Sequence, residues 1–259
     1  MFLKKVVNYI KSIHYDKGVI HYDSLDSTNE EAKRLIQTGS IERSAIIIAD
    51  TQTSGKTTKI NKIWNSPIGN LYTSYIYKID NVNYLTKISS LVSVAILRTI
   101  QYFSVSCDLK TVDIKIKWPN DILINEKKLS GILIEVEKFK KDTFVIIGTG
   151  VNILKAPKIN DGRSATSLID EGFYLNVHKF AKIYNNILKR MLNKLDDQSF
   201  LEIRKTILQY SYKIGENIKI MTSDGKKLSG KFAHIDKRGA LILETKKGDM
   251  VQVMSGSII

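Results

Sequence analysis

Residues 117–135 read KWPNDILINEKKLSGILIE and combine a rigid corner with two strand-like segments. Proline has no N–H to donate to a β-ladder, so Pro119 ends the preceding strand and favours an extended conformation at Trp118. Isoleucine and lysine alternate in DIKIK just before the corner, which predicts that Lys117 lies on the face opposite the isoleucines. Gly131 leaves space in the middle of a strand for a ligand or another backbone segment. The stretch therefore predicts a β-hairpin with a lysine at the edge of a cleft.

Helical and strand-like segments surround this hairpin in mixed order. Continuous apolar runs and period-two patterns predict strands, whereas apolar residues at helical spacing predict helices. The strands are predicted at 45–50, 69–79, 113–118, 121–125, 129–139 and 143–154, and the helices near 23–39, 85–103, 176–195 and 197–210. This order predicts an α+β fold, with the helix at 85–103 in a central position.

The first of these helices carries signals at both ends. Ser27 with Glu30, or Thr28 with Glu31, has the spacing of a capping box. Gly39 is a natural helix stop.

The sequence pattern changes at about Lys213, from helical segments to short strand-like segments. Four short strand-like segments follow, separated by Asp-Gly, Arg-Gly and Lys-Gly-Asp turns. This pattern predicts a small β-barrel of SH3-like size. We therefore expect two domains, 1–212 and 213–259.

The bulk composition is that of a globular protein with a basic excess. The chain has 259 residues, 43% of them hydrophobic, and a formal charge of +14. Cys107 is the only cysteine, which excludes a disulfide framework, and the four histidines show no metal-ligand spacing. Lysines interrupt the apolar residues after Met1 too often for a signal peptide or a membrane span, so we expect a cytoplasmic protein.

The charge has two interpretations. A basic protein can bind nucleic acid through the phosphates. Alternatively, the lysines occupy solvated faces and reflect a bias of the genome toward AT. Lysines spread over the whole length favour the second interpretation, and we expect no specific DNA binding.

Residues 51–67, TQTSGKTTKINKIWNSP, contain a Gly-Lys-Thr string that suggests a phosphate-binding loop. The P-loop pattern requires a glycine five positions before this string. Asp50 stands there, and its carboxylate repels phosphate. The segment is therefore not a P-loop, although we expect it to be a loop that meets a phosphate.

Several motifs together resemble those of biotin–protein ligases, over nearly the whole chain. The strongest are KWPND at 117–121 and KLSGILIE at 128–135. Five further motifs occur in the same order as in the family: DSTN (26–29), Gln52, WNSPIGNLY (64–72), GTGVNI (148–153) and ATSL (165–168). The resemblance implies a mixed-sheet catalytic domain of the biotin/lipoate ligase type with helices packed on it, followed by an SH3-like barrel. Members that repress transcription carry an additional N-terminal winged helix, for which the residues before Ser24 are too few.

The resemblance also implies roles for individual residues. Lys117 is expected to be the catalytic cation, and the biotin-binding set is expected to be Ser27, Thr28, Asn29, Gln52, Lys117 and Gly131. The loop over the adenylate phosphate is expected to comprise Gly55, Lys56, Thr57, Thr58 and Lys59, together with Trp64. Asn152 and Ala165 are expected on the ATP side, and no metal ligand is assigned. The loop departs from the family because lysines and threonines replace its arginines, and lysine lacks the bidentate geometry of arginine.

The implied reaction has two steps. Biotin and ATP give biotinyl-5'-AMP and pyrophosphate, and a lysine of a biotin carboxyl carrier protein then attacks the adenylate. Mg²⁺ is expected with ATP, and the protein is expected to be a monomer or homodimer. The alternatives are a lipoate–protein ligase, which shares the adenylation logic, and a basic nucleic-acid-binding protein.

Overall fold

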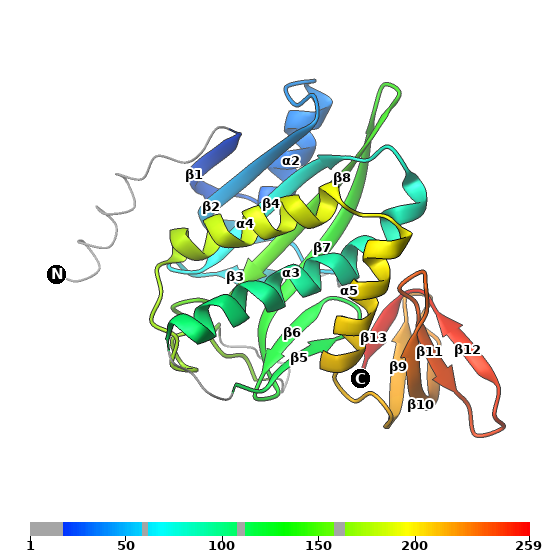
Figure 1. Cartoon of the computed structure of the whole chain (residues 1–259). Helices are drawn as coiled ribbons and strands as arrows, with labels where there is room; N and C mark the ends of the chain where they lie inside the picture. Colours follow the sequence, from blue (N-terminus) through cyan, green and yellow to red (C-terminus); the bar gives the residue numbers. More distant parts are fainter. Residues whose placement is uncertain (1–17, 59–61, 108–111, 158–163) are drawn as a thin grey trace.

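The computed structural model describes residues 18–58, 62–107, 112–157 and 164–259. Its larger sheet has the strand order β1-β2-β4-β8-β7-β6-β5, with β3 paired to β2 outside this path (Figure 1). The bounds are β1 Val19–Leu25, β2 Ser44–Gly55, β3 Trp64–Ser66, β4 Leu71–Lys78, β5 Ile114–Lys117, β6 Asp121–Ile124, β7 Lys127–Phe139 and β8 Asp142–Val151. The β1–β2 pair is parallel and the other pairs are antiparallel, so the expected mixed sheet is confirmed.

Helices cover both faces of this sheet (Figure 1). Helix α2 (Thr28–Gln37) packs on one face, against β2, β4, β7 and β8. Helices α3 (Leu85–Ser106), α4 (Val177–Asn193) and α5 (Asp197–Tyr210) cover the other face, and the short 3₁₀ helix η1 (Val82–Tyr84) leads into α3. The predicted helices and strands of this region are therefore present, with bounds shifted by a few residues.

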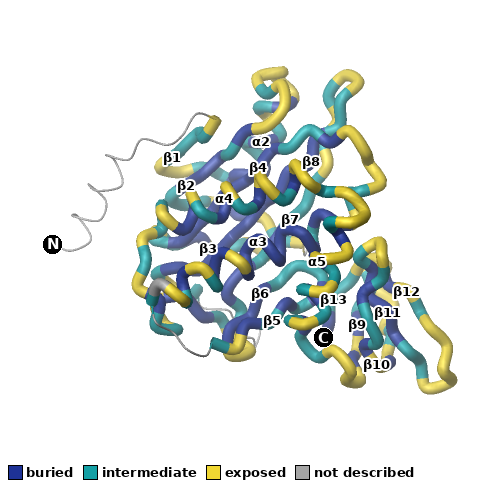
Figure 2. Tube along the Cα trace, in the orientation of Figure 1, coloured by how far each residue is buried: buried dark blue, intermediate teal, exposed yellow. Residues whose placement is uncertain are grey.

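Two apolar layers hold the sheet between these helices, and Figure 2 shows buried strands between them. Among the described residues, Val82–Val105 is the one helix long and apolar enough to cross a membrane, and 67% of its most apolar window is buried inside the protein. A helix that is apolar on all sides belongs in a protein core as readily as in a bilayer. Helix α3 packs against β6 and β7 of the sheet and against its neighbours α4 and α5, which is the place of a core helix. The residues after Met1 that we discussed as a signal or span lie outside the described part.

The predicted capping box of α2 is wrong. Ser27 is the N-cap residue but makes no side-chain capping bond. The two glutamates that would complete the box bind elsewhere, because Glu30 accepts from Lys33 and Glu31 accepts from Tyr22 and Arg34. The predicted stop is confirmed, since Gly39 has a φ of +71° and its N–H bonds to the carbonyl of Ile36.

The segment predicted to be one loop, 51–67, is partly strand. Strand β2 continues through Gly55, and β3 pairs with it, matching Gln52 with Ser66 and Gly55 with Trp64. A Cβ on Gly55 would lie 2.5 Å from the carbonyl oxygen of Trp64, so only glycine allows the two chains to approach so closely here.

The C-terminal residues form a separate antiparallel sheet of five strands, one more than predicted. The strands are β9 Asn217–Thr222, β10 Lys227–Ile235, β11 Leu241–Glu244, β12 Met250–Val253 and β13 Gly256–Ile258. The order is β12-β11-β10-β9-β13, and among the described residues the two outer strands do not pair with each other; the small antiparallel C-terminal domain is therefore present as expected, without a strand pair that closes it into a barrel. The three predicted turns are confirmed, because each has a glycine at φ between +85° and +88° (Gly225, Gly239 and Gly248).

Candidate active site

One row of directly paired residues crosses the larger sheet. Lys117 pairs with Asp121, Asp121 with Gly131, Gly131 with Gly150, and Gly150 with Tyr72. Directly opposite residues in an antiparallel sheet face the same side. The whole row therefore lies on the face of the sheet that carries α2. It places the Lys117 cation and the Asp121 carboxylate at one end, and the two glycines, which have no side chain, in the middle.

The indole of Trp64 lies flat against the two glycines of this row. A Cβ on Gly131 would lie 2.8 Å from its Cζ3, and a Cβ on Gly150 would lie 2.6 Å from its Cε2. Heavy atoms do not approach so closely, so both positions must be glycine. We expected a ligand or another backbone segment against Gly131, and the structure places the side chain of Trp64 there instead.

Lys128 also points into the site, although the sequence analysis did not select it. Its Nζ lies 2.6 Å from Asp121 Oδ1 and 5.4 Å from the centre of the Trp64 ring. Strict alternation counted from Gly131 would place Lys128 on the other face. The β6–β7 pairing shifts register, however: Ile122 pairs with Ser130, and the next residue pairs with Lys128. This β-bulge redirects the lysine toward Asp121.

A chain of hydrogen bonds joins the expected biotin-binding residues. Gln52 donates to Ser66 Oγ at 3.0 Å and accepts from the backbone N–H of Thr28 at 2.9 Å. Ser74, from β4, donates to Thr28 Oγ1 at 2.7 Å and also to Asn29 Oδ1. The side chains share one network, which fixes the orientation of each amide and hydroxyl group.

The network ends at a charged residue of β7. Asn29 Nδ2 donates to Glu135 Oε2 at 2.7 Å, and Lys33 donates to the other oxygen at 2.7 Å. A Cβ on Gly148 would lie 2.4 Å from Asn29 Oδ1, so this third glycine provides the space for Asn29. Ser27, Thr28 and Asn29 are all at least 96% buried.

The start of the expected phosphate loop is tied to α2 by charge. Lys56 forms an ion pair with Glu30, which also accepts from Lys33 at 3.0 Å. Burial alone would raise the pKa of Glu30, but hydrogen bonds from Lys56 and Lys33 outweigh it and lower that pKa. Burial would likewise lower the pKa of Lys33, and its bonds to Glu135 and Glu30 raise it instead. Glu30 and Lys33 therefore stay ionised at neutral pH.

The remaining loop residues are less constrained. Thr57 Oγ1 donates to the carbonyl of Lys62 at 3.2 Å, and Thr58 is exposed. Lys59 lies outside the described residues.

The two residues expected on the ATP side lie next to Lys128. Ala165 forms an isolated parallel bridge with Lys128, and Asn152 donates to the carbonyl of Thr166 at 3.0 Å. Asn152 is 1% exposed, and its Oδ1 is buried without a hydrogen-bond partner in the described part of the chain. A buried acceptor without a partner requires an explanation, such as a bound water molecule or a bound ligand.

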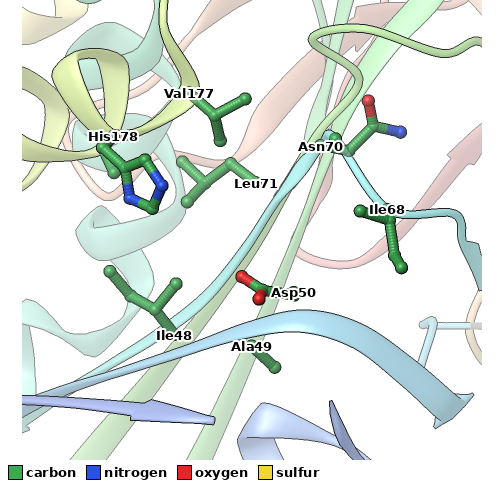
Figure 3. A pocket seen from close by; sticks show the side chains of 10 residues that line it. Ile48, Ala49, Asp50, Ile68, Asn70, Leu71, Val177 and His178 are labelled. Carbon is green, nitrogen blue, oxygen red and sulfur yellow. The ribbon is translucent and has the colours of Figure 1, made fainter. Parts of the chain in front are cut away.

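Figure 3 shows a different hollow, a cavity of about 30 Å³ between β2, the 68–71 turn and the start of α4. This volume holds one or two water molecules. Asp50 and His178 line it, and Asp50 Oδ1 accepts a hydrogen bond from His21 Nε2 at 2.8 Å. The cavity is too small for a nucleotide or a cofactor and lies on the α4 side of the sheet, away from α2. Over residues 18–58, 62–107, 112–157 and 164–259, no group of three or more His, Cys, Asp or Glu side chains could hold a metal ion.

Comparison with known proteins places this chain in a class of protein ligases. The family model described as "Biotin/lipoate A/B protein ligase family" matches residues 22–152, and "Biotin protein ligase C terminal domain" matches residues 213–259. The first match covers half of the chain, and the chain therefore belongs to the biotin/lipoate A/B protein ligase family. The family expected from the motifs is confirmed.

Individual relatives agree with this assignment. The "Bifunctional ligase/repressor BirA" of Bacillus subtilis is 29% identical over 89% of this chain and 70% of its own length. The "Biotin--[acetyl-CoA-carboxylase] ligase" of Paracoccus denitrificans is 28% identical over 87% of this chain and 94% of its own. The solved structure of a biotin protein ligase from Aquifex aeolicus in complex with biotin and ATP has a TM-score of 0.76 at 23% identity, covering 94% of this chain and 98% of that one, and shows the same fold.

Proposed function

We propose that this protein activates biotin with ATP to biotinyl-5'-AMP and transfers the biotinyl group to a lysine of a biotin carboxyl carrier protein. The observation that carries the proposal is the division of the site into two parts. Two lysines, Lys117 and Lys128, lie at one end of the glycine row, and a buried network of amides and hydroxyls lies beside the other. The first part suits two anions, and the second suits an uncharged polar ring.

The cationic end supports the adenylation step. A carboxylate oxygen of biotin attacks the α-phosphorus of ATP, and the bond to pyrophosphate breaks. Both reactants are anions, so a fixed cation must lie between them. Lysine has an ordinary pKa of about 10.4 and is charged at neutral pH. In our proposal Lys117 and Lys128 hold the two anions together and stabilise the charge that develops on phosphorus.

The uncharged end supports recognition of biotin. The ureido group of biotin offers both N–H donors and a carbonyl acceptor. Thr28, Asn29 and Gln52 supply both kinds of group in orientations that their mutual hydrogen bonds fix. The indole of Trp64 and the bare backbone at Gly131 provide a flat apolar wall for the rest of the molecule.

The unpaired Asn152 Oδ1 supports an ATP side near Lys128. An adenine amino group is a donor of the required kind. Ala165, in the segment bridged to Lys128, would border the same space.

In the second step the amine of the carrier lysine attacks the carbonyl carbon of the adenylate. AMP leaves with the bond electrons, and the amine loses a proton to give an amide. We further propose that ATP enters as its Mg²⁺ complex. The protein works in the cytoplasm as a monomer or homodimer and does not bind DNA specifically. The chain divides at residue 213 into two domains.

Incubation with ATP, biotin and a biotin carboxyl carrier domain, followed by avidin blotting, tests the proposal. We expect biotin on the carrier lysine, and none on a carrier in which that lysine is arginine. Pyrophosphate release with lipoate but not with biotin would show that the protein is a lipoate ligase instead. Release with neither acid would refute the proposal.

A further inference from the structure

The corner between β5 and β6 holds the residues of the cationic end. Lys117 and Asp121 are directly paired, and Trp118, Pro119 and Asn120 form the turn between them. Two contacts fix this corner within the catalytic region. Ser89 Oγ, from α3, donates to the carbonyl of Pro119 at 2.7 Å, and Asn120 Nδ2 donates to the carbonyl of Ile132 at 2.7 Å.

A third contact comes from the C-terminal sheet. The indole N–H of Trp118, a side chain only 6% exposed, donates to the carbonyl oxygen of Gly239 at 3.3 Å. Gly239 lies in the turn between β10 and β11, 121 residues further along the chain. A turn of the C-terminal sheet therefore contacts the residue next to Lys117.

This turn is built rigidly. Asp236 Oδ1 accepts from the backbone N–H groups of Arg238 and Ala240 at 2.7 and 3.0 Å, and the Gly239 N–H bonds to the Asp236 carbonyl at 3.1 Å. A side-chain bond from Gln252 to Asp236 ties the turn to β12. Rigid support is needed if a turn is to hold a neighbouring side chain in place.

Gly239 also fits tightly against the catalytic region. A Cβ at this position would lie 2.9 Å from the carbonyl oxygen of Thr86 and 3.5 Å from Ser90 Oγ, both in α3. The glycines of the other two turns, Gly225 and Gly248, have no atom of the described residues within 4 Å of the same position. Their φ values of +85° and +88° match the +86° of Gly239. The three turns therefore impose the same backbone strain on a substituted alanine and differ in their contact with the catalytic region.

We propose that the β10–β11 turn positions the Lys117–Asp121 corner for adenylation, with Gly239 and Trp118 as the positioning residues. The inference rests on the proposed function. The turn touches no substrate in this account. The turn holds Trp118 in place. Because Lys117 and Asp121 belong to the same corner, the turn thereby also positions Lys117 and the Asp121 carboxylate that binds Lys128. The C-terminal sheet would thereby contribute to the first chemical step.

The test compares Gly239→Ala with Gly225→Ala and Gly248→Ala in biotin-dependent ATP–pyrophosphate exchange. We expect Gly239→Ala to lower kcat at least about tenfold with little change in KM for biotin, because a misplaced cation weakens transition-state binding more than ground-state binding. The two control variants should keep the kcat of the unaltered protein. Thermal unfolding measures the cost in stability: the backbone strain should lower Tm in all three variants, and the contact with Thr86 should lower it further in Gly239→Ala.

Two further readouts separate positioning from general stability. Trp118→Phe keeps an aromatic ring but removes the donor, and we expect kcat to fall about three- to tenfold. Tryptophan emission should shift to longer wavelength in Gly239→Ala, because the Trp118 side chain would become more exposed to solvent. It should not shift in Gly225→Ala or Gly248→Ala.

Equal kcat and equal emission in Gly239→Ala and Gly248→Ala would overturn this inference while leaving the proposed function intact. No exchange in the unaltered protein would refute the proposed function, and the positioning role with it.

Discussion

The ammonium group of Lys128 lies 2.6 Å from a carboxylate oxygen of Asp121, and the β-bulge between β6 and β7 is what brings the two together. The side chains are 20% and 13% exposed, so water screens the pair only partly. In the proposed reaction the pair holds the lysine in place until an anionic substrate arrives.

Replacing Lys128 by methionine should lower the rate of biotinyl-adenylate formation about a hundredfold, as expected for a lost electrostatic donor. Methionine keeps most of the apolar stem over Trp64. Pyrophosphate exchange measures the rate, and Lys127→Met is the control because Lys127 is half exposed and pairs loosely with Glu171. Exchange at the unaltered rate in Lys128→Met would remove this lysine from the mechanism.

Lys117→Ala should fold normally and lose adenylate formation at least about a hundredfold. The same exchange assay applies, with Lys115→Ala, two residues earlier on the strand, as the matched control. If Lys117→Ala exchanges pyrophosphate as the unaltered protein does, Lys128 is the only essential lysine of the pair.

Gly150→Ala should displace the Trp64 indole, because the new methyl group would lie 2.6 Å from it. We expect weaker biotin binding in calorimetry and a change in tryptophan emission. The double variant Gly150→Ala/Trp64→Ala is the decisive comparison. If the clash is the cause, Gly150→Ala should cost much less stability in the Trp64→Ala background than alone. Additive effects on Tm would contradict the contact.

Lys56→Glu should speed the escape of biotinyl-adenylate, because it replaces attraction to the phosphate by repulsion and places a second carboxylate beside Glu30. Release of preformed radiolabelled adenylate on gel filtration gives the rate. Lys141→Glu, an exposed lysine at the β7–β8 turn, makes the same charge change near the C-terminal end of α2, at the other end of the helix from Glu30. Equal escape rates in the two variants would mean that Lys56 does not face the adenylate.

The stability of the fold should depend on His178 as the pH falls below about 6.5. Burial lowers the pKa of His178 below its ordinary value; His21 lowers it further, and Asp50 partly opposes this. The unfolded chain therefore binds a proton more readily than the folded protein, and stability falls as pH drops through about 6.5. His178→Gln should reduce this fall in Tm, whereas Lys179→Gln should leave it unchanged. An identical pH profile in His178→Gln would show that the group does not titrate differently on folding.

The alternation of isoleucine and lysine before Pro119 correctly predicted the face of Lys117, and the Gly-containing turns correctly marked the C-terminal strands. Lys128 escaped prediction because periodicity assumes an unbroken ladder, whereas the bulge shifts the register by one residue. The capping box failed for a related reason. Glu30 and Glu31 had the right spacing, but Lys33 and Arg34 of the same helix, together with Tyr22 and Lys56 from other segments, bind these carboxylates instead.

The three glycines Gly131, Gly148 and Gly150 have a consequence for engineering the specificity of the protein. At each of them the neighbouring side chain already lies against bare main chain. Glycine is the smallest residue, so every substitution there removes volume and none can add it. A version that accepts a bulkier acid must therefore gain its space from the opposite wall, by shortening Trp64 or a residue at the start of α2. Random mutagenesis for enlarged substrates should accordingly return changes in these two segments and none on β7 or β8 at the glycine positions.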